Sequence, residues 1–221
     1  MIPDWQPVLP KVQPILGVPE GPYLERTSPE GQENFRQNVA RLVERGFKII
    51  RRKVMPDFEA IAERHQCIMA AEAAQVHARW FADYASLYHE KTADLIRQGQ
   101  SISIETLQEA LPGREKLREE LMTAMEKAGI DLWIAPAARG TAPFGLQSTG
   151  DPVMNLPWTH SGLPTITLPS GFNEIGLPFG LQVVGRWYGD ELLLAWASEM
   201  EGALGGQTHQ PEDVIKPAAG F

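Results

Sequence analysis

The chain has 221 residues, of which 43% are hydrophobic and 22% are charged, and its formal net charge is −8. This composition is typical of a globular protein with one sizeable core, and we expect a single α/β domain. The acidic balance argues against a nucleic-acid partner, because neutralising phosphates needs a basic face and no Lys/Arg run is longer than Arg51-Arg52-Lys53. The single cysteine, Cys67, excludes an internal disulfide, and its alanine-rich surroundings predict a buried, inert thiol.

The sequence predicts neither a membrane protein nor a secreted one. No stretch has the apolar length that a membrane-spanning helix needs. The N-terminal stretch MIPDWQPVLPKVQP is too rich in proline for the apolar part of a signal peptide. We therefore expect a cytoplasmic protein.

The N-terminal quarter predicts an extended segment, a helix and a strand. Residues 1–24 contain six prolines, which forbid a regular helix and favour an extended segment that lies over a surface. A helix should begin at Ser28 and Pro29, because a capping side-chain oxygen followed by proline suits a first turn. Gly46 supplies its end, and residues 47–54 have the β-branched content of a strand.

Two helical stretches follow, each with an expected break. The first is capped by Asp57 and covers residues 58–84; it can continue, bent, to residue 96, with the break at 85–92. The second is capped by Ser103, is kinked by Pro112 at or before Leu111, and ends at Gly129. Residues 131–136 then read as a short buried strand, and 137–151 as a long irregular loop of the kind that often carries function.

The stretch NLPWTHSGLPTITLPSG, residues 155–171, has prolines and glycines within an apolar sequence. Such residues specify a backbone path, and the path usually shapes a pocket wall or a tight entry into a sheet. Strands are expected at 165–168 and 179–185, joined as a hairpin, and Asp190 should cap a last helix that ends at Gly205. We expect one domain over residues 25–206, after the extended segment 1–24 and before a polar tail at 207–221.

The common catalytic and metal-binding motifs are absent from the sequence. It contains no G-x-S-x-G elbow, Walker A loop, G-x-G-x-x-G, H-E-x-x-H or cysteine pair, and we expect no cofactor and no metal. His65 and His77 are twelve residues apart on one predicted helix, which favours surface or capped core histidines over metal ligands. His160 and Ser161 are adjacent, but a base and its nucleophile are normally brought together by the fold, so adjacency does not predict catalysis.

Several segments in order resemble the amidase signature family of hydrolases. They are DLWIAP, STGD, NLPWTHSGLPTITLPSG and GLPFGLQVVGRWYGDELLLAWASEME, and upstream KVQPILGVPEGPYLE and ENFRQNVARLVERGFKI. The resemblance covers residues 7–204 and is to the C-terminal half of these enzymes. It implies an α/β fold, with a mixed β-sheet flanked by helices, and hydrolysis of carbon–nitrogen bonds in amides.

The resemblance also implies a Ser-Ser-Lys triad, which in the family lies in a Gly/Ser-rich segment of the N-terminal half. This sequence has no two adjacent serines and no serine after a glycine. We therefore expect no catalytic residue here and an isolated chain that is not a competent amidase. Three interpretations stay open: a pocket-forming fragment, one chain of a split enzyme completed by a partner that carries the triad, and a noncatalytic module that binds a small molecule or a protein. A homo-oligomer is a further expected state.

Four residues before and within the Pro/Gly stretch are the candidate substrate-binding residues: Asp151, Asn155, Trp158 and Thr159. They combine a carboxylate, an amide, an aromatic ring and a hydroxyl, which suits the binding of a small-molecule amide in an apolar wall. Alternatively, Asp151 only starts a turn and Trp158 only fills the core. Arg139 and Gln147 are weaker candidates.

Overall fold

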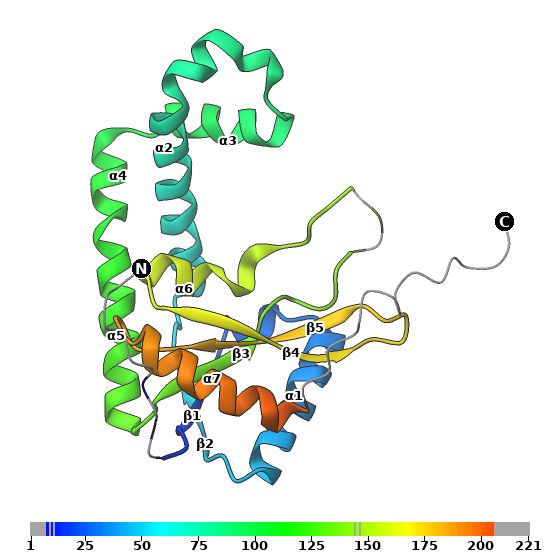
Figure 1. Cartoon of the computed structure of the whole chain (residues 1–221). Helices are drawn as coiled ribbons and strands as arrows, with labels where there is room; N and C mark the ends of the chain where they lie inside the picture. The colour runs from blue at the N-terminus through cyan, green and yellow to red at the C-terminus, as the bar shows by residue number, and fades with distance from the viewer. Residues whose placement is uncertain (1–7, 9, 11, 144, 146, 206–221) are drawn as a thin grey trace, which may run out of the picture.

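The computed structural model describes residues 8, 10, 12–143, 145 and 147–205. Within this part, one mixed sheet has the strand order β2-β1-β3-β5-β4. β1 is parallel to β2 and β3, whereas β5 is antiparallel to β3 and β4. Helices cover both faces, which confirms the expected mixed sheet flanked by helices (Figure 1). The strands are β1 (Leu16–Glu20), β2 (Ile49–Lys53), β3 (Leu132–Pro136), β4 (Thr165–Phe172) and β5 (Pro178–Val184).

The proline-rich N-terminal segment contributes an inner strand. Residues Leu16–Glu20 lie between β2 and β3 and are largely buried, so the expectation of a segment over the surface is wrong for them. Pro19 is compatible with this position because β3 pairs only with Leu16 and Gly17, before the proline is reached. Gly17 is also needed here, since a Cβ atom on it would stand 2.6 Å from the ring of Trp133.

One face of the sheet is covered by α1 (Pro29–Glu44) and α7 (Asp190–Leu204). Ser28 caps α1 as expected, its hydroxyl accepting a hydrogen bond from the Gly31 amide at 3.1 Å. Asp190 is the first residue of α7 and not its cap, which is Gly189. A carboxylate in the first turn still favours the helix through its dipole. The core on this face includes Phe35, Val39, Leu42, Leu193, Trp196 and Met200.

The opposite face is covered by the start of α2 (Phe58–Tyr84), by α5 (Pro112–Ala128) and by α6 (Leu156–Ser161). Alternate residues of β3 serve the two layers: Leu132 and Ile134 pack toward α1 and α7, and Trp133 and Ala135 toward this second layer. Its core includes Tyr23, Phe58, Leu117, Leu121, Met125 and Trp158.

The long helical stretches break where the sequence predicts. After α2 comes a short turn of 3₁₀ helix (Ala85–Leu87) and then α3 (Glu90–Gln100). Ser103 caps α4 (Ile104–Ala110), and Pro112 begins α5, so Leu111 joins the two helices. The outer part of α2, with α3 and α4, stands away from the sheet (Figure 1). Two expectations on α2 are wrong: Asp57 makes no capping bond, and Cys67 is half-buried rather than buried.

The Pro/Gly stretch folds as a short helix followed by a strand. Residues Leu156–Ser161 form α6, which the sequence analysis did not predict, with a proline near its start and Gly162 in the left-handed conformation at its end (φ 71°). β4 then turns back into β5, and this confirms the hairpin. A helix of six residues is too short to show a helical repeat of apolar positions.

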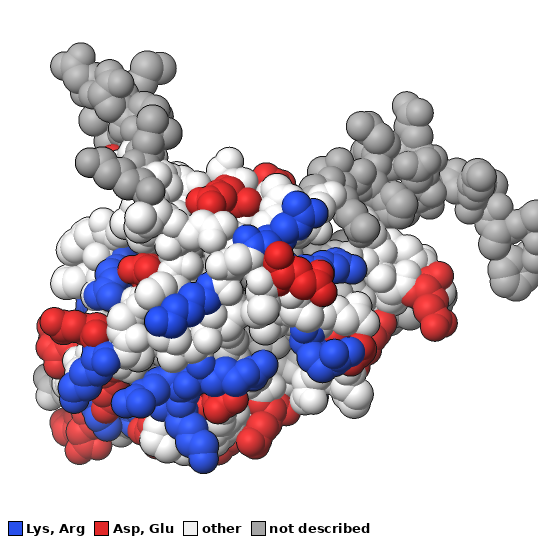
Figure 2. All heavy atoms as spheres, turned by 90° about the horizontal axis from the view of Figure 1, so that it is seen from below, with Lys and Arg blue, Asp and Glu red and all other residues white. Residues whose placement is uncertain are grey.

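The surface carries both signs of charge. On the face that Figure 2 shows, acidic side chains lie among the basic ones. No helix within the described ranges is both long and apolar enough to cross a membrane. The first seven residues and the tail expected from residue 207 lie outside the described part.

Candidate functional site

The candidate residues lie on the connection from β3 to β4. The loop after β3 leads into a turn of 3₁₀ helix (Pro152–Met154) and then into α6. The exposed carboxylate of Asp151 accepts a hydrogen bond from the Val153 amide at 3.0 Å and pairs with Arg139 at 3.3 Å. Asp151 therefore starts a turn, as the alternative interpretation has it, and a contact with substrate stays a prediction.

Arg139 attaches this loop to the start of α1. Its Nε donates to the Arg26 carbonyl at 2.9 Å, and its own carbonyl accepts from the Ser28 amide at 2.7 Å. The chain comes so close here that a Cβ atom on Gly31 would stand 2.3 Å from the Arg139 carbonyl oxygen. The loop thus has a defined path at its first turn. Gln147, the other weaker candidate, is exposed.

Trp158 is a core residue with a polar anchor. It is 1% exposed, and its Nε1 donates to the Tyr23 hydroxyl at 3.0 Å. That hydroxyl in turn donates to the Met154 carbonyl at 2.8 Å. Burial raises the pKa of Tyr23 far above its ordinary value, more than the hydrogen bond from Trp158 lowers it, so the phenol stays protonated.

Asn155 and Thr159 point in different directions from this anchor. Asn155 Oδ1 accepts a hydrogen bond at 2.9 Å from Nε2 of Gln182, a buried residue of β5. Thr159 is exposed and lines a cavity against α2, together with His65 and His160. The four candidate residues therefore lie close along the chain but do not converge on one point in this structure.

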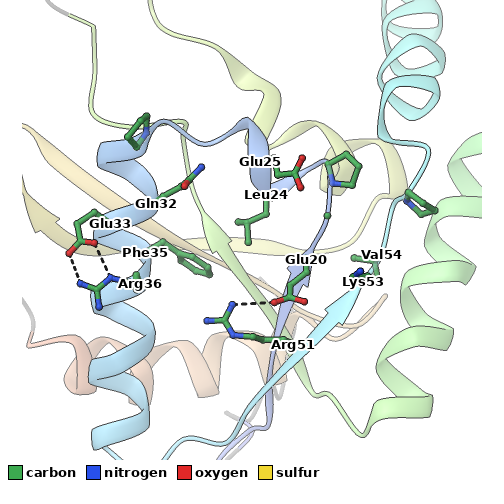
Figure 3. A pocket seen from close by; sticks show the side chains of 14 residues that line it. Glu20, Leu24, Glu25, Gln32, Glu33, Phe35, Arg36, Arg51, Lys53 and Val54 are labelled. Carbon is green, nitrogen blue, oxygen red and sulfur yellow. Dashed lines mark hydrogen bonds and ion pairs between the residues drawn. The ribbon is translucent and has the colours of Figure 1, made fainter.

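A larger cavity lies at the ends of β1 and β2, which the sequence analysis missed. Its volume is about 980 Å³, and Glu20, Arg51 and Lys53 approach it from the two strands (Figure 3). Arg51 pairs with Glu20 at 3.5 Å, and Arg36 of α1 pairs with Glu33 at 2.6 Å. The carboxyl ends of parallel strands are the usual ligand sites of open α/β sheets. The sequence analysis missed this cavity because it did not predict β1, and without β1 the parallel pair that forms the cavity edge could not be predicted.

Leu24 and Phe35 lie between the two ion pairs of this cavity (Figure 3). The cavity thus has an apolar floor and a charged rim, which suits a ligand or a segment of mixed polarity. Glu33 is exposed, and its hydrogen bonds with Arg36 and then Gln37 lower its pKa to about 2. Its carboxylate is therefore ionised at all ordinary pH values.

No serine and lysine of the described residues form a catalytic pair. All five lysines in this part are exposed, namely Lys48, Lys53, Lys91, Lys116 and Lys127. A lysine that acts as a base near neutral pH has to be desolvated. Ser161 is buried beside His160, but its hydroxyl donates to the Trp158 carbonyl at 3.2 Å, as a helical serine commonly does.

One family profile and several solved structures of known proteins match this chain. The sequence profile of the family described as "Amidase" matches residues 11–194. A solved structure described as a crystal structure of amidase is 26% identical and superposes with a TM-score of 0.80, covering 90% of this chain and 48% of its own. A comparison with curated proteins finds no significant match.

Two other solved structures share the fold at lower identity. A fatty acid amide hydrolase is 18% identical with a TM-score of 0.76, covering 91% of this chain and 42% of its own. A 6-aminohexanoate cyclic dimer hydrolase complexed with substrate is 20% identical with a TM-score of 0.64, covering 89% and 46%. The chain thus spans about half the length of the structures that it matches.

Proposed function

Because this chain belongs to the amidase family, as the profile match over residues 11–194 establishes, we propose that it is the pocket-forming part of an amide hydrolase and is inactive on its own. Inactivity is supported by the serine and lysine side chains that the chain has. The 221 residues contain no adjacent serines, and every lysine of the described part is exposed. Without an activated nucleophile and its base, an amide bond is hydrolysed only at the slow uncatalysed rate.

We infer that the connection from β3 to β4 forms one wall of the substrate pocket. Asn155 and Gln182 hold the connection against β5, while Tyr23 and Trp158 hold it against the core. Because these side chains do not converge on one point, we propose that Asp151, Asn155 and Thr159 contact separate parts of an amide substrate and its leaving group, while buried Trp158 fixes α6 against the core. The bonds of Asp151 to Arg139 and Val153 support a fixed carboxylate at this edge.

The test is an assay of the purified 221-residue chain with hexanamide and with an anilide. We expect no hydrolysis above background, because losing a covalent nucleophile and its base removes on the order of 10⁶-fold in rate. Hydrolysis that phenylmethylsulfonyl fluoride abolishes would contradict the proposal. The inhibitor separates an intrinsic serine nucleophile from slow background reaction.

A second candidate, one chain of a split amidase, is favoured by the surface that this chain leaves open. In the described part, β2 and β4 are the edges of the sheet, and an edge strand presents unpaired backbone groups. The outer part of α2 also exposes Val76, Trp80 and Tyr84, which are 73%, 61% and 54% exposed. An apolar stripe of this kind indicates a partner surface.

We propose that such a partner carries the Ser-Ser-Lys segment and covers these surfaces. Co-expression with the Gly/Ser-rich half of an amidase should give a stable complex, and hydrolysis only in the mixture. The same mixture with both serines of the partner segment changed to alanine is the control, and it should bind without hydrolysis. Failure of the two halves to associate would count against this second candidate.

A further inference from the structure

A cavity between α2, α5 and α6, here named the His160 cavity, has polar groups that nothing in the chain satisfies. Its volume is about 380 Å³, within the range of small-molecule sites. One wall is apolar and consists of Ile68, Met69 and Val76 from α2. The polar part of the lining consists of His65, Glu72, His77, Arg114, Thr159 and His160.

His160 is the central group of this cavity. Its side chain is 2% exposed, and neither Nδ1 nor Nε2 has a hydrogen-bond partner. The backbone of Gly113 lies beside the ring and weakly favours its charged form, but it does not meet either nitrogen with hydrogen-bond geometry. Leaving a buried donor or acceptor unpaired destabilises the chain, so the ring nitrogens are available to a partner from outside the chain.

Arg64 adds a further unpaired donor close by. Its Nε is buried without a partner, and a Cβ atom on Gly113 would stand 2.7 Å from this Nε and 3.4 Å from His160 Nε2. The missing side chain of Gly113 is what allows Arg64 and His160 to approach the same point. Three unpaired polar atoms therefore gather where α2, α5 and α6 meet.

The electrostatic field at His160 is positive. Its pKa is lowered to about 4, first by burial and then by His65, Arg64 and Arg114. Two carboxylates nearby offset part of the charge of these arginines, since Glu72 pairs with Arg114 at 3.4 Å and Asp57 with Arg64 at 3.4 Å. The pKa of the neighbouring His65 ring, 5.6 Å from His160 between centroids, is also lowered, by burial and then by Arg114, while Glu72 raises it. A positive field of this kind attracts an anion.

We propose that the His160 cavity binds a small organic anion, a monocarboxylate with a short apolar chain. Its carboxylate would lie against His160 and Arg114, and its chain against Ile68, Met69 and Val76. A metal ion does not fit the site, because the described residues contain no group of three or more His, Cys, Asp or Glu side chains that could hold one.

Binding of the anion should be linked to uptake of a proton. An anion beside His160 favours the imidazolium form and raises the pKa of His160 from its low value in the free chain. Wherever the complex holds more protons than the free chain, affinity increases as pH falls. Hexanoate should therefore bind more tightly at about pH 6, where the complex can hold a proton on His160, than at about pH 8, where the ring of the complex is neutral as well.

The experiment is titration calorimetry of the 221-residue chain with hexanoate, and with hexanamide as the uncharged analogue. We expect saturable binding of hexanoate that depends on Arg114, and no binding of hexanamide that depends on Arg114. Arg114→Gln should weaken hexanoate binding about tenfold. Glu72→Gln should strengthen it, because the carboxylate of Glu72 competes for Arg114. Arg118→Gln is the matched control on the same helix, since Arg118 lies over the ring of Trp187 and not in the cavity.

The ring resonances of His160 and His65 in NMR spectra give a second measurement. Both should move on addition of hexanoate, and His160→Phe should remove the pH dependence of binding. The inference fails if hexanamide moves the ring resonances of His160 and His65 as far as hexanoate does, if Arg114→Gln and Arg118→Gln bind hexanoate alike, or if no ring resonance moves. None of these outcomes depends on amide hydrolysis, so the inference and the proposed function can fail separately.

Discussion

The Tyr23 hydroxyl joins Trp158 to Met154, accepting a hydrogen bond from the indole at 3.0 Å and donating one to the carbonyl at 2.8 Å. Trp158 and Tyr23 are 135 positions apart in the chain, and their rings meet edge to face at 5.5 Å. This contact attaches the connection before β4 to the segment that follows β1. Met154 and Trp158, within the segment of the candidate binding residues, are therefore held by the core.

Tyr23→Phe should destabilise the fold without changing its shape. The ring stays, but Trp158 Nε1 and the Met154 carbonyl lose their buried partner, so the free energy of unfolding should fall by about 1–3 kcal/mol. Urea unfolding measures the change. Tyr84→Phe is the control, because Tyr84 is 54% exposed, and it should change stability by less than about 0.5 kcal/mol. Equal effects of the two variants would contradict the anchoring role.

Asn155→Ala should cost more than Gln182→Met, although the two side chains share one hydrogen bond. Gln182 is 3% exposed, and its Oε1 already lacks a partner, so removing Asn155 leaves the whole amide unsatisfied. We expect a loss of about 1–3 kcal/mol for Asn155→Ala and a smaller one for Gln182→Met. In the double variant the loss should be smaller than the sum of the two, as a double-mutant cycle in urea would show. Additive losses would mean that the bond contributes nothing.

Sequence patterns predicted the elements that local chemistry specifies. Ser28 followed by Pro29 predicts the start of α1, and Pro112 predicts the break between α4 and α5, because capping and the missing amide act within one turn. β1 was missed because Pro19 and the prolines on either side of the strand argue against a strand, and only the pairing of β1 with β2 and β3 explains how Pro19 is tolerated. Pairing between distant strands leaves no local signal.

The candidate site was predicted as a segment but not as a geometry. Asp151, Asn155, Trp158 and Thr159 do lie on one connection, yet burial turns Trp158 inward and leaves Thr159 facing α2. The partners that decide these directions, Tyr23, Gln182 and His65, come from other parts of the chain. The residue types show the chemistry available, while only packing shows what each side chain contacts.

Gly99→Ala and Gly202→Ala should have opposite effects. A Cβ atom on Gly99 would stand 1.9 Å from the Ala70 carbonyl oxygen, where α3 packs on α2, so the helices must separate. We expect a loss of about 1–3 kcal/mol from overpacking. Gly202 lies in α7 with nothing within 4 Å of its Cβ position, so alanine should stabilise the helix by about 0.5–1 kcal/mol. Thermal unfolding gives both signs, and a neutral Gly99→Ala would contradict the close packing.

Stability should fall between about pH 6.5 and pH 4, partly because of His160. The folded chain holds the pKa of His160 at about 4, below its ordinary value of 6.5. Over this window the unfolded chain binds more protons than the folded one, so the free energy of unfolding increases as pH rises. The stabilising contribution of the neutral imidazole is therefore lost as pH falls from about 6.5 to the folded pKa of about 4. The contribution of His160 is at most about 3 kcal/mol, as follows from the difference between these two pKa values.

Carboxylates titrate at low pH as well, so the measurement has to be a difference between variants. The free energy of unfolding of His160→Phe should depend less steeply on pH than that of the parent, since the variant has no buried imidazole to protonate. Leu87→Ala is the control, because Leu87 is 80% exposed and carries no titratable group, so the slope should stay unchanged. Parallel slopes for the parent and His160→Phe would mean that His160 titrates alike in both states, which its burial and the positive charges of His65, Arg64 and Arg114 argue against.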